Sequence, residues 1–424
     1  MRKNLILSIC FCLVSCSSSS AQEEIPDGDK TSYYWNPVID YSLPDPTIIE
    51  GGDGYYYLYA TEDIRNLPIH RSKDLINWEW VGTAFTDRTR PDFEPGGGLW
   101  APDINKIGDT YVLYYSMSKW GGEWTCGIGC ATADKLSGPF KDHGLMFRSN
   151  EINVQNSIDP FYIEDAGKKF LFWGSFRGIY GIELSEDGLS IKQGKKPRQV
   201  AGTAYEGTYI HKKEGFYYFF ASIGTCCEGL NSTYTTVVAR SENLFGPYVD
   251  KNGRTMMDNQ HEVLIHKNSS FVGTGHNSEI VTDKVGNDWV FYHAVATKHP
   301  EGRVLMMDKI SWKDGWPVVA TDSPSLKSEK RGMPECSVRG TREPGPRKAT
   351  SIPSLFISRE VERATRECRM SPTIRTRFPL TSGNTSRIVK ESSSAWEGWA
   401  WAPSPAFTTL AQVWRAITFG KPLL

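Results

Sequence analysis

The stretch Asp53-Gly54-Tyr55-Tyr56-Tyr57-Leu58-Tyr59 is a two-residue turn signal followed directly by a run of aromatic residues that is typical of a β-strand. The same phrase, a turn and then Tyr, Phe, Trp or Val, recurs four more times. These copies begin at Gly108, Gly167, Glu214 and Gly286. A phrase that occurs five times, at intervals of roughly 50 to 70 residues, predicts a repeat architecture of five similar units.

Further strand-like runs fill the units, and Gly, Asp, Asn or Pro bounds each of them. No apolar run with the period of a helix and a length of three turns accompanies them. The expected strands include residues 55–61, 111–117, 127–133, 170–176, 216–222, 235–241, 289–295 and 304–312. The sequence therefore predicts an all-β protein, and five units of about four strands each predict a five-bladed β-propeller.

A short polar motif precedes each turn-and-strand phrase. The five motifs are Pro44-Asp45-Pro46, Ala101-Pro102-Asp103, Ile158-Asp159-Pro160, Tyr205-Glu206-Gly207 and Gly275-His276-Asn277. A propeller brings one end of every innermost strand to the central channel. We therefore expect Asp45, Asp159 and Glu206, which are far apart in the sequence, to lie together there.

Three carboxyl groups at one site are suited to the hydrolysis of a glycosidic bond. One group must protonate the departing oxygen and another must activate water or attack directly. The acid needs a raised pKa to keep its proton near neutral pH, and a neighbouring carboxylate raises it. Taken singly, each of these acids could equally cap a turn beside Pro or Gly.

The motifs resemble those of glycoside hydrolase family 43, and in particular its arabinanases, over about residues 36–319. The matching stretches are Leu43-Pro44-Asp45-Pro46-Thr47, Leu99-Trp100-Ala101-Pro102-Asp103, Asn156-Ser157-Ile158-Asp159-Pro160, Tyr205-Glu206-Gly207 and Gly275-His276-Asn277-Ser278. The run from Cys226 to Tyr234 resembles the endo-acting branch. The resemblance implies a five-bladed propeller that hydrolyses α-1,5-L-arabinofuranosidic bonds of arabinan and inverts the anomeric centre.

The resemblance also implies a role for each site residue. Asp45 would be the general base, Glu206 the general acid, and Asp159 the group that raises the pKa of Glu206 and orients it. His276 would contact one calcium ion in the propeller channel, mainly through water, and no organic cofactor is expected. The expected substrate-binding residues are Asp45, Trp100, Gly129, Asn156, Ser157, Ile158, Asp159, Trp173, Gly174 and Ser175.

Other functions fit parts of the same pattern. An exo-acting α-L-arabinofuranosidase or a β-xylosidase would use the same fold and the same acids. A glycan-binding surface lipoprotein without activity would use the aromatic residues but would not need all three acids. A glycosyltransferase with a covalent aspartate would retain the stereochemistry instead of inverting it.

The chain ends differ in composition from its centre. Residues 1–16 resemble a lipoprotein export signal, with Arg2 and Lys3 before an apolar run and Cys16 as the acylated residue; a simple signal cleaved near Ala21 is the alternative. Residues 17–32 would be a flexible tether and 33–322 the catalytic propeller. Residues 323–424 hold 17 Lys and Arg, 8 Glu and no Asp or Tyr, which favours a disordered tail or a reading-frame error near Arg331.

Charge and cysteine usage limit the partners. Since the basic residues concentrate in the tail, the body of the chain is acidic, and this argues against nucleic acid as a partner. We expect an exported monomer, held at the cell envelope only by a lipid on Cys16 or else periplasmic or secreted. Cys226 and Cys227 are adjacent and are not expected to bond each other easily. A bridge from Cys126 to one of them is an open alternative, and no spacing indicates a zinc site.

Overall fold

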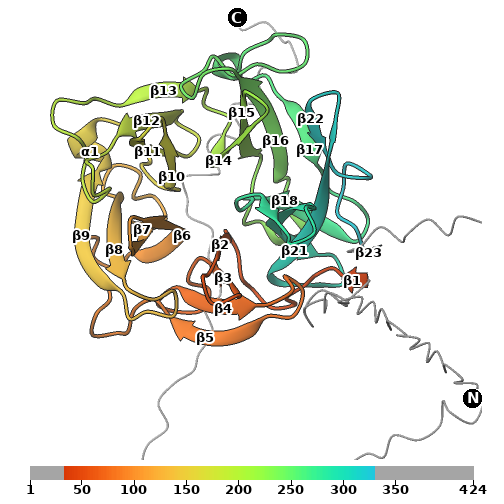
Figure 1. The fold of residues 1–424 in the computed structure, drawn as a ribbon, viewed down its shortest axis with the longest axis horizontal. Coiled ribbons are helices and arrows are strands. Elements are labelled where there is room, and N and C mark those ends of the chain that lie inside the picture. Colours follow the sequence, from red (N-terminus) through yellow and green to blue (C-terminus); the bar gives the residue numbers. More distant parts are fainter. Residues whose placement is uncertain (1–32, 330–424) are drawn as a thin grey trace, which may run out of the picture. The chain divides into compact units, whose positions relative to one another are not determined.

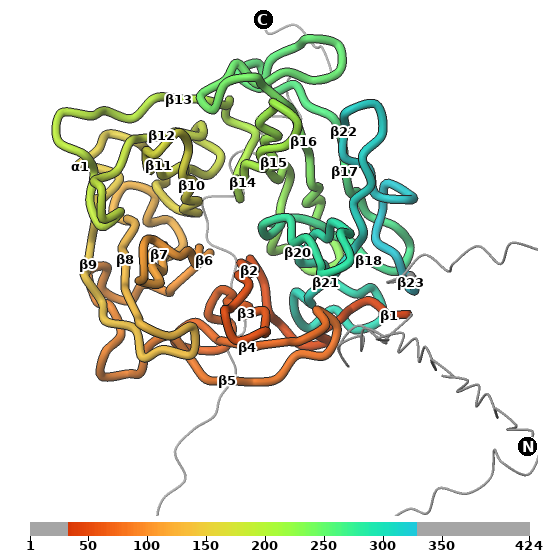
Figure 2. The backbone as a smooth tube through the Cα atoms, viewed as in Figure 1, coloured from red at the N-terminus to blue at the C-terminus, as the bar shows by residue number. Residues whose placement is uncertain are grey.

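The computed structural model describes residues 33–329, and these form β-sheets arranged in a ring around a central axis (Figures 1 and 2). The predicted export signal, the tether and most of the predicted tail lie outside the described residues. Within residues 33–329 no helix has the length and apolarity needed to cross a membrane.

The first three blades are separate four-stranded antiparallel sheets. Blade 1 contains β2 (Thr47–Glu50), β3 (Tyr56–Tyr59), β4 (Pro68–Ser72) and β5 (Glu79–Thr83). Blade 2 contains β6 (Gly98–Ile107), β7 (Thr110–Ser118), β8 (Gly127–Ala133) and β9 (Lys141–Arg148), and α1 (Ser149–Ile152) follows it. Blade 3 contains β10 (Phe161–Asp165), β11 (Lys168–Trp173), β12 (Ile179–Glu183) and β13 (Arg198–Ala201).

The last two blades are joined into one nine-stranded sheet by a single parallel pairing between β16 and β18. Blade 4 contains β14 (Glu206–Lys213), β15 (Phe216–Ile223), β16 (Thr235–Ser241) and β17 (Glu262–Ile265), with the short 3-10 turns η2 (Gly229–Asn231) and η3 (Met256–Asp258). Blade 5 contains β18 (Phe271–Gly275), β19 (Val281–Thr282), β20 (Asp288–Ala296), β21 (His299–Lys313) and β22 (Trp316–Val318). The topology is therefore the predicted five-bladed propeller.

Both faces of each blade pack against a neighbour, and this explains why the strands are continuous apolar runs instead of alternating ones. In β3 all four residues of the run Tyr-Tyr-Leu-Tyr are buried. The hydrophobic clusters lie between adjacent blades. One contains residues of blades 1 and 2, another residues of blades 2 and 3, and a third residues of blades 1 and 5.

The N-terminal part of the described chain closes the ring against blade 5. Ile39 bridges Leu305 of β21 in antiparallel fashion, and the Asn36 side chain exchanges two hydrogen bonds with the backbone of Met307. Alongside, β1 (Tyr33–Trp35) pairs with β23 (Lys327–Glu329). We call this contact between the segment 33–43 and blade 5 the seam. Strand structure thus continues past the predicted boundary at residue 322, because these two short strands pair with each other at the seam.

Three of the predicted motifs stand at or directly before the start of β2, β10 and β14, whereas the second motif lies within β6 and the fifth begins at the last residue of β18. All eight predicted strand runs overlap strands in the structure. In every motif one residue has a backbone φ in the left-handed region. These residues are Asp45, Ala101, Asp159, Gly207 and His276. A left-handed residue other than Gly is uncommon and is concentrated at functional sites. Three of the five, Asp45, Asp159 and His276, line the pocket described below.

Candidate active site

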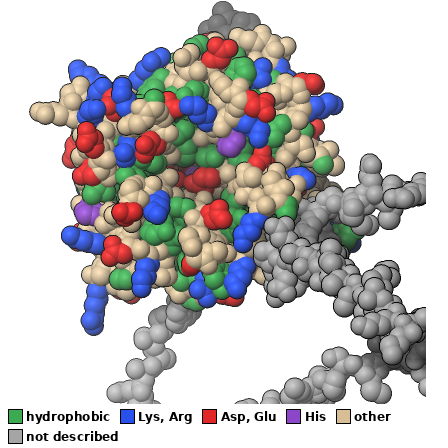
Figure 3. Space-filling view, in the orientation of Figure 1, with side chains coloured by type: hydrophobic (Ala, Val, Ile, Leu, Met, Phe, Trp, Pro, Cys, Tyr) green, Lys and Arg blue, Asp and Glu red, His purple; other side chains and the backbone are tan. Residues whose placement is uncertain are grey.

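A pocket of about 810 Å³ opens at the mouth of the channel, and Asp45, Asp159 and Glu206 all line it. In the space-filling view, acidic side chains lie among hydrophobic ones near the middle of the face (Figure 3). The volume falls within the range of ligand-binding sites in proteins. The structure thus brings together the three acids that the sequence motifs singled out.

Asp45 lies among a hydroxyl group, two imidazole rings and a guanidinium group. Thr61 Oγ1 donates a hydrogen bond of 2.6 Å to its Oδ2. Its Oδ1 lies 3.1 Å from His293 Nδ1, 3.2 Å from His276 Nδ1 and 3.5 Å from Arg303 Nη1. Burial opposes the ionisation of Asp45, but Arg303 and the two histidines outweigh it, so the pKa of Asp45 lies well below its usual range. Asp45 is therefore a carboxylate at neutral pH.

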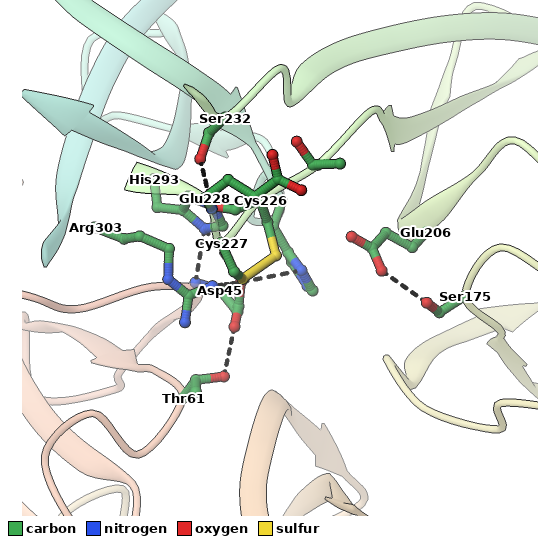
Figure 4. The surroundings of a disulfide bond; sticks show 12 residues. Asp45, Thr61, Ser175, Glu206, Cys226, Cys227, Glu228, Ser232, His293 and Arg303 are labelled. Atoms are coloured by element: carbon green, nitrogen blue, oxygen red, sulfur yellow. Dashed lines mark hydrogen bonds and ion pairs between the residues drawn. A yellow bond between two sulfur atoms is a disulfide. The ribbon is translucent and has the colours of Figure 1, made fainter. Parts of the chain in front are cut away.

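Glu206 lies on the other side of the opening and has the opposite electrostatic character (Figure 4). Ser175 Oγ donates a hydrogen bond of 2.7 Å to Glu206 Oε2. Burial raises the pKa of Glu206 to about 7 and the charge of Asp45 adds to this, although hydrogen bonds from Ser175 and Tyr234 act in the opposite direction. Glu206 can thus hold a proton near neutral pH.

Asp159 connects to Glu206 through the backbone. Its Oδ2 accepts a hydrogen bond of 3.2 Å from the backbone N–H of Gly207, and its own N–H donates to Ser116 Oγ at 2.8 Å. Burial and the charges of Glu206 and Asp45 raise the pKa of Asp159. Since each carboxyl group opposes the ionisation of the other, Asp159 and Glu206 together retain a proton that an isolated acid would lose.

Aromatic and amide groups complete the pocket wall. Trp100 is half-buried, and its ring centroid lies 5.7 Å from that of Trp120, which is 80% exposed. Asn156 and Ile158 line the pocket as expected, and Asn156 Nδ2 also donates to the backbone oxygen of Ser175. Exposed indole rings beside the acids offer surfaces on which sugar rings can pack.

Four of the expected substrate-binding residues are not among the residues that line the pocket: Gly129, Ser157, Trp173 and Gly174. Trp173 is fully buried, and its Nε1 donates to Ser157 Oγ at 3.0 Å. A side chain on Gly129 would collide with the ring of Tyr115, and one on Gly174 with the backbone of Gly178. The contacts around these residues are those of close packing within the protein.

Sequence reasoning did not assign Thr61, His293 or Arg303 to the site. His293 is fully buried in β20, within a run of otherwise mostly apolar residues, and such a lone buried histidine is the one signal that could have marked it. Arg303 lies beside the seam: its backbone N–H donates to Ser42 Oγ and its carbonyl accepts from Leu43 N–H. The sequence gives no sign that this arginine reaches Asp45.

The expectation about the adjacent cysteines was wrong. Cys226 and Cys227 form a disulfide with each other, and both line the pocket. Cys126, the expected alternative partner, is a free thiol. It is fully buried with its Sγ 3.2 Å from Ser149 Oγ, whereas Cys227 is exposed.

The calcium site at His276 stays a prediction. His276 lines the pocket, but its Nδ1 faces Asp45, and this leaves one ring nitrogen for another ligand. Among residues 33–329 no three His, Cys, Asp or Glu side chains form a group that could hold a metal. Calcium takes about six to eight oxygen ligands, so an ion bound at His276 would depend on water for most of them.

The fold and the site define a class: a β-propeller with one ionised carboxylate and one carboxyl group of raised pKa in the same pocket, as the hydrolysis of glycosidic bonds requires. Residues 34–317 match the family model of glycosyl hydrolases family 43. The chain belongs to this family, as the sequence motifs predicted.

Relatives within the family carry two kinds of names. The chain is 34% identical to the extracellular endo-alpha-(1->5)-L-arabinanase 1 of Bacillus subtilis (strain 168), over 65% of this chain and 87% of that protein. It is also 34% identical to the extracellular exo-alpha-(1->5)-L-arabinofuranosidase ArbA of Cellvibrio japonicus (strain Ueda107), over 65% of this chain and 85% of that protein. The structure of Cellvibrio cellulosa alpha-L-arabinanase complexed with arabinohexaose matches with a TM-score of 0.60 at 30% identity, covering 66% of this chain and 96% of that one.

Proposed function

We propose that the protein hydrolyses the α-1,5-L-arabinofuranosidic bonds of arabinan, within the chain and with inversion of the anomeric centre. The observation that carries this proposal is the pairing of an ionised Asp45 with a Glu206 whose pKa is about 7 in one pocket. These are the protonation states that a general base and a general acid need at the start of the reaction.

In the proposed reaction, Asp45 takes a proton from a water molecule while that water attacks the anomeric carbon. Glu206 gives its proton to the departing glycosidic oxygen as the bond to that oxygen breaks. The sugar leaves with inverted configuration, and the two carboxyl groups exchange protonation states until solvent restores them. Asp159 would keep Glu206 in place through Gly207 and oppose the loss of its proton.

Three lines support arabinan as the substrate and export as the destination. Both relatives are named for α-1,5-linked arabinan chemistry and both are named extracellular, and the matching solved structure is described as holding arabinohexaose. The lipid anchor on Cys16 lies outside the described residues and stays a prediction.

The endo mode of attack is the finer part of the proposal. Trp120 extends an aromatic surface outward from Trp100, which provides contacts for sugar units beyond the two at the scissile bond. Exo action is the second candidate, because the Cellvibrio relative named for it is as similar as the endo-acting one.

Linear α-1,5-arabinan should yield a spread of arabino-oligosaccharides in the first minutes of reaction. Chain cleavage at internal bonds produces such a mixture, whereas removal of terminal units yields one product size. Chromatography of early time points, with Glu206→Gln as the blank, measures this. A single product from the outset would establish exo action, and no sugar release by a folded protein would reject the hydrolase.

The pH dependence of kcat/KM should show a plateau in the mildly acidic range and a fall above pH 7. Glu206 must be protonated to act as the acid, so activity decreases as the pH rises through its pKa of about 7. Asp45 must be ionised, and its depressed pKa places the acidic limb at strongly acidic pH. A profile measured on short arabino-oligosaccharides tests this, and constant activity to pH 9 would contradict it.

Arg303→Gln and Arg303→Lys form a matched pair for the same profile. The Arg303 charge lowers the pKa of both Asp45 and Glu206. The neutral variant should therefore move both limbs to higher pH, and the lysine variant should move them less.

A further inference from the structure

The disulfide between Cys226 and Cys227 lies at the opening that holds the acids. Both residues belong to the loop that joins β15 to β16, and both line the same pocket as Asp45 and Glu206 (Figure 4). Cys226 is half-buried and Cys227 is exposed. The mechanism proposed above uses neither of them.

The loop that carries the disulfide is fixed by its own hydrogen bonds. Thr225 N–H donates to Thr233 Oγ1 at 3.0 Å, and Thr233 N–H donates back to Thr225 O at 3.0 Å. Ser232 Oγ accepts from Glu228 N–H at 3.0 Å and donates to Cys226 O at 3.2 Å. The disulfide is therefore held on a loop with a defined conformation.

Stabilisation of the fold does not explain this disulfide. A disulfide stabilises chiefly by closing a loop in the unfolded chain, and the effect grows with the length of that loop. Cys226 and Cys227 are one residue apart, so their bond closes almost no chain. The two other cysteines of residues 33–329, Cys126 and Cys130, are buried free thiols in the interior and do not line the pocket.

We propose that the small ring closed by the Cys226–Cys227 disulfide is a contact surface for a sugar unit of the bound substrate. This inference rests on the proposed action on an arabinan chain. The disulfide side of the ring presents two sulfur atoms and two methylene groups, none of which carries an N–H or O–H donor, so this side is apolar. Apolar surfaces take the C–H faces of sugars, and a covalent ring loses little conformational freedom when a ligand packs on it.

The neighbourhood of the ring supports a binding role. Trp100 and Trp120 line the same pocket, so aromatic and disulfide surfaces both border the substrate space. Tyr234 ends the loop and hydrogen-bonds Glu206. A disturbance of the whole loop would therefore change the pKa of Glu206, whereas loss of the ring surface alone would change only the binding of the sugar.

The test compares the parent protein and the double variant Cys226→Ser/Cys227→Ser. Each is assayed in the absence and in the presence of a phosphine reductant. We expect the variant to raise KM for arabino-oligosaccharides about tenfold, which is a loss of about 1.4 kcal/mol of binding, while kcat stays within about twofold. Reduction of the parent protein should have the same effect. The reductant should not change the double variant, since its remaining described cysteines are buried.

The outcomes separate this inference from the proposed function. An active parent with an unchanged KM in the double variant would overturn the sugar contact and leave the hydrolase in place. A fall in kcat together with a shift of the alkaline pH limb would also overturn it, because the loop would then act through Tyr234 and Glu206. A folded parent that releases no sugar from arabinan would reject the proposed function itself.

Discussion

Asp45→Asn should lower kcat/KM on linear arabinan by about 10³-fold to 10⁴-fold, the upper range for the loss of a general base. Asparagine has nearly the same shape and can still accept the hydrogen bond from Thr61, so the pocket should keep its form. It cannot take a proton from water. Steady-state rates with arabino-oligosaccharides of defined length measure the loss, and KM should change far less than kcat.

A matched control and a rescue distinguish a base from a merely structural carboxylate. Asp109→Asn, at an exposed position in the turn between β6 and β7, makes the same chemical change away from the pocket and should leave the rate unaltered. In Asp45→Ala, azide should restore turnover, because this anion attacks without giving up a proton and forms an arabinosyl azide of inverted configuration. Activity of Asp45→Asn within tenfold of the parent would remove Asp45 from the proposed role.

Glu206→Gln should lower kcat on arabinan by about 10²-fold to 10⁴-fold, because the departing sugar oxygen would leave without a proton. The loss should depend on the leaving group. A dinitrophenyl α-L-arabinofuranoside releases a stable phenolate that needs no proton, so the variant should hydrolyse it at a rate much nearer to that of the parent. Parallel rates on the two substrates measure this difference.

The same pair of substrates separates the two acids. Asp45→Asn should lose activity on the aryl substrate as well as on arabinan, because water still needs a base. Equal losses on both substrates in Glu206→Gln would show that Glu206 does not act as the acid. The hydrogen bond from Ser175 to Glu206 Oε2 can be kept by glutamine, so a change in folding is not expected to obscure the comparison.

The fold could be predicted from the sequence because short local patterns mark each repeat. Each unit contains a turn signal followed by an aromatic strand, and the strands predicted on residues 127–133 and 235–241 match β8 and β16 residue for residue. The three acids could be predicted because each lies in a short motif at the start of a unit. A propeller converts equivalent positions in its repeats into neighbours in space.

Residues that join the site through long-range packing could not be predicted in this way. His293 and Arg303 reach Asp45 from β20 and β21, and their positions depend on how the last blade meets the first. Gly129 and Trp173 were assigned to the substrate by resemblance; they are not among the residues that line the pocket, and their assignment stays a prediction. The disulfide between Cys226 and Cys227 was not predicted, because the Cα atoms of adjacent residues are closer together than those of most bonded cysteines.

The seam between the first and last blades also sets the order in which this protein can mature during synthesis. Asn36 leaves the ribosome long before its hydrogen-bond partner Met307, which lies 271 residues later in the chain. The segment around Asn36 therefore stays unpaired until β21 has been synthesised, and contacts of such long range form late in folding. The same seam positions Arg303 beside Asp45. A nascent or prematurely ended chain would therefore contain Asp45 without Arg303 and without a complete pocket around it, and hydrolytic activity would report that the ring has closed.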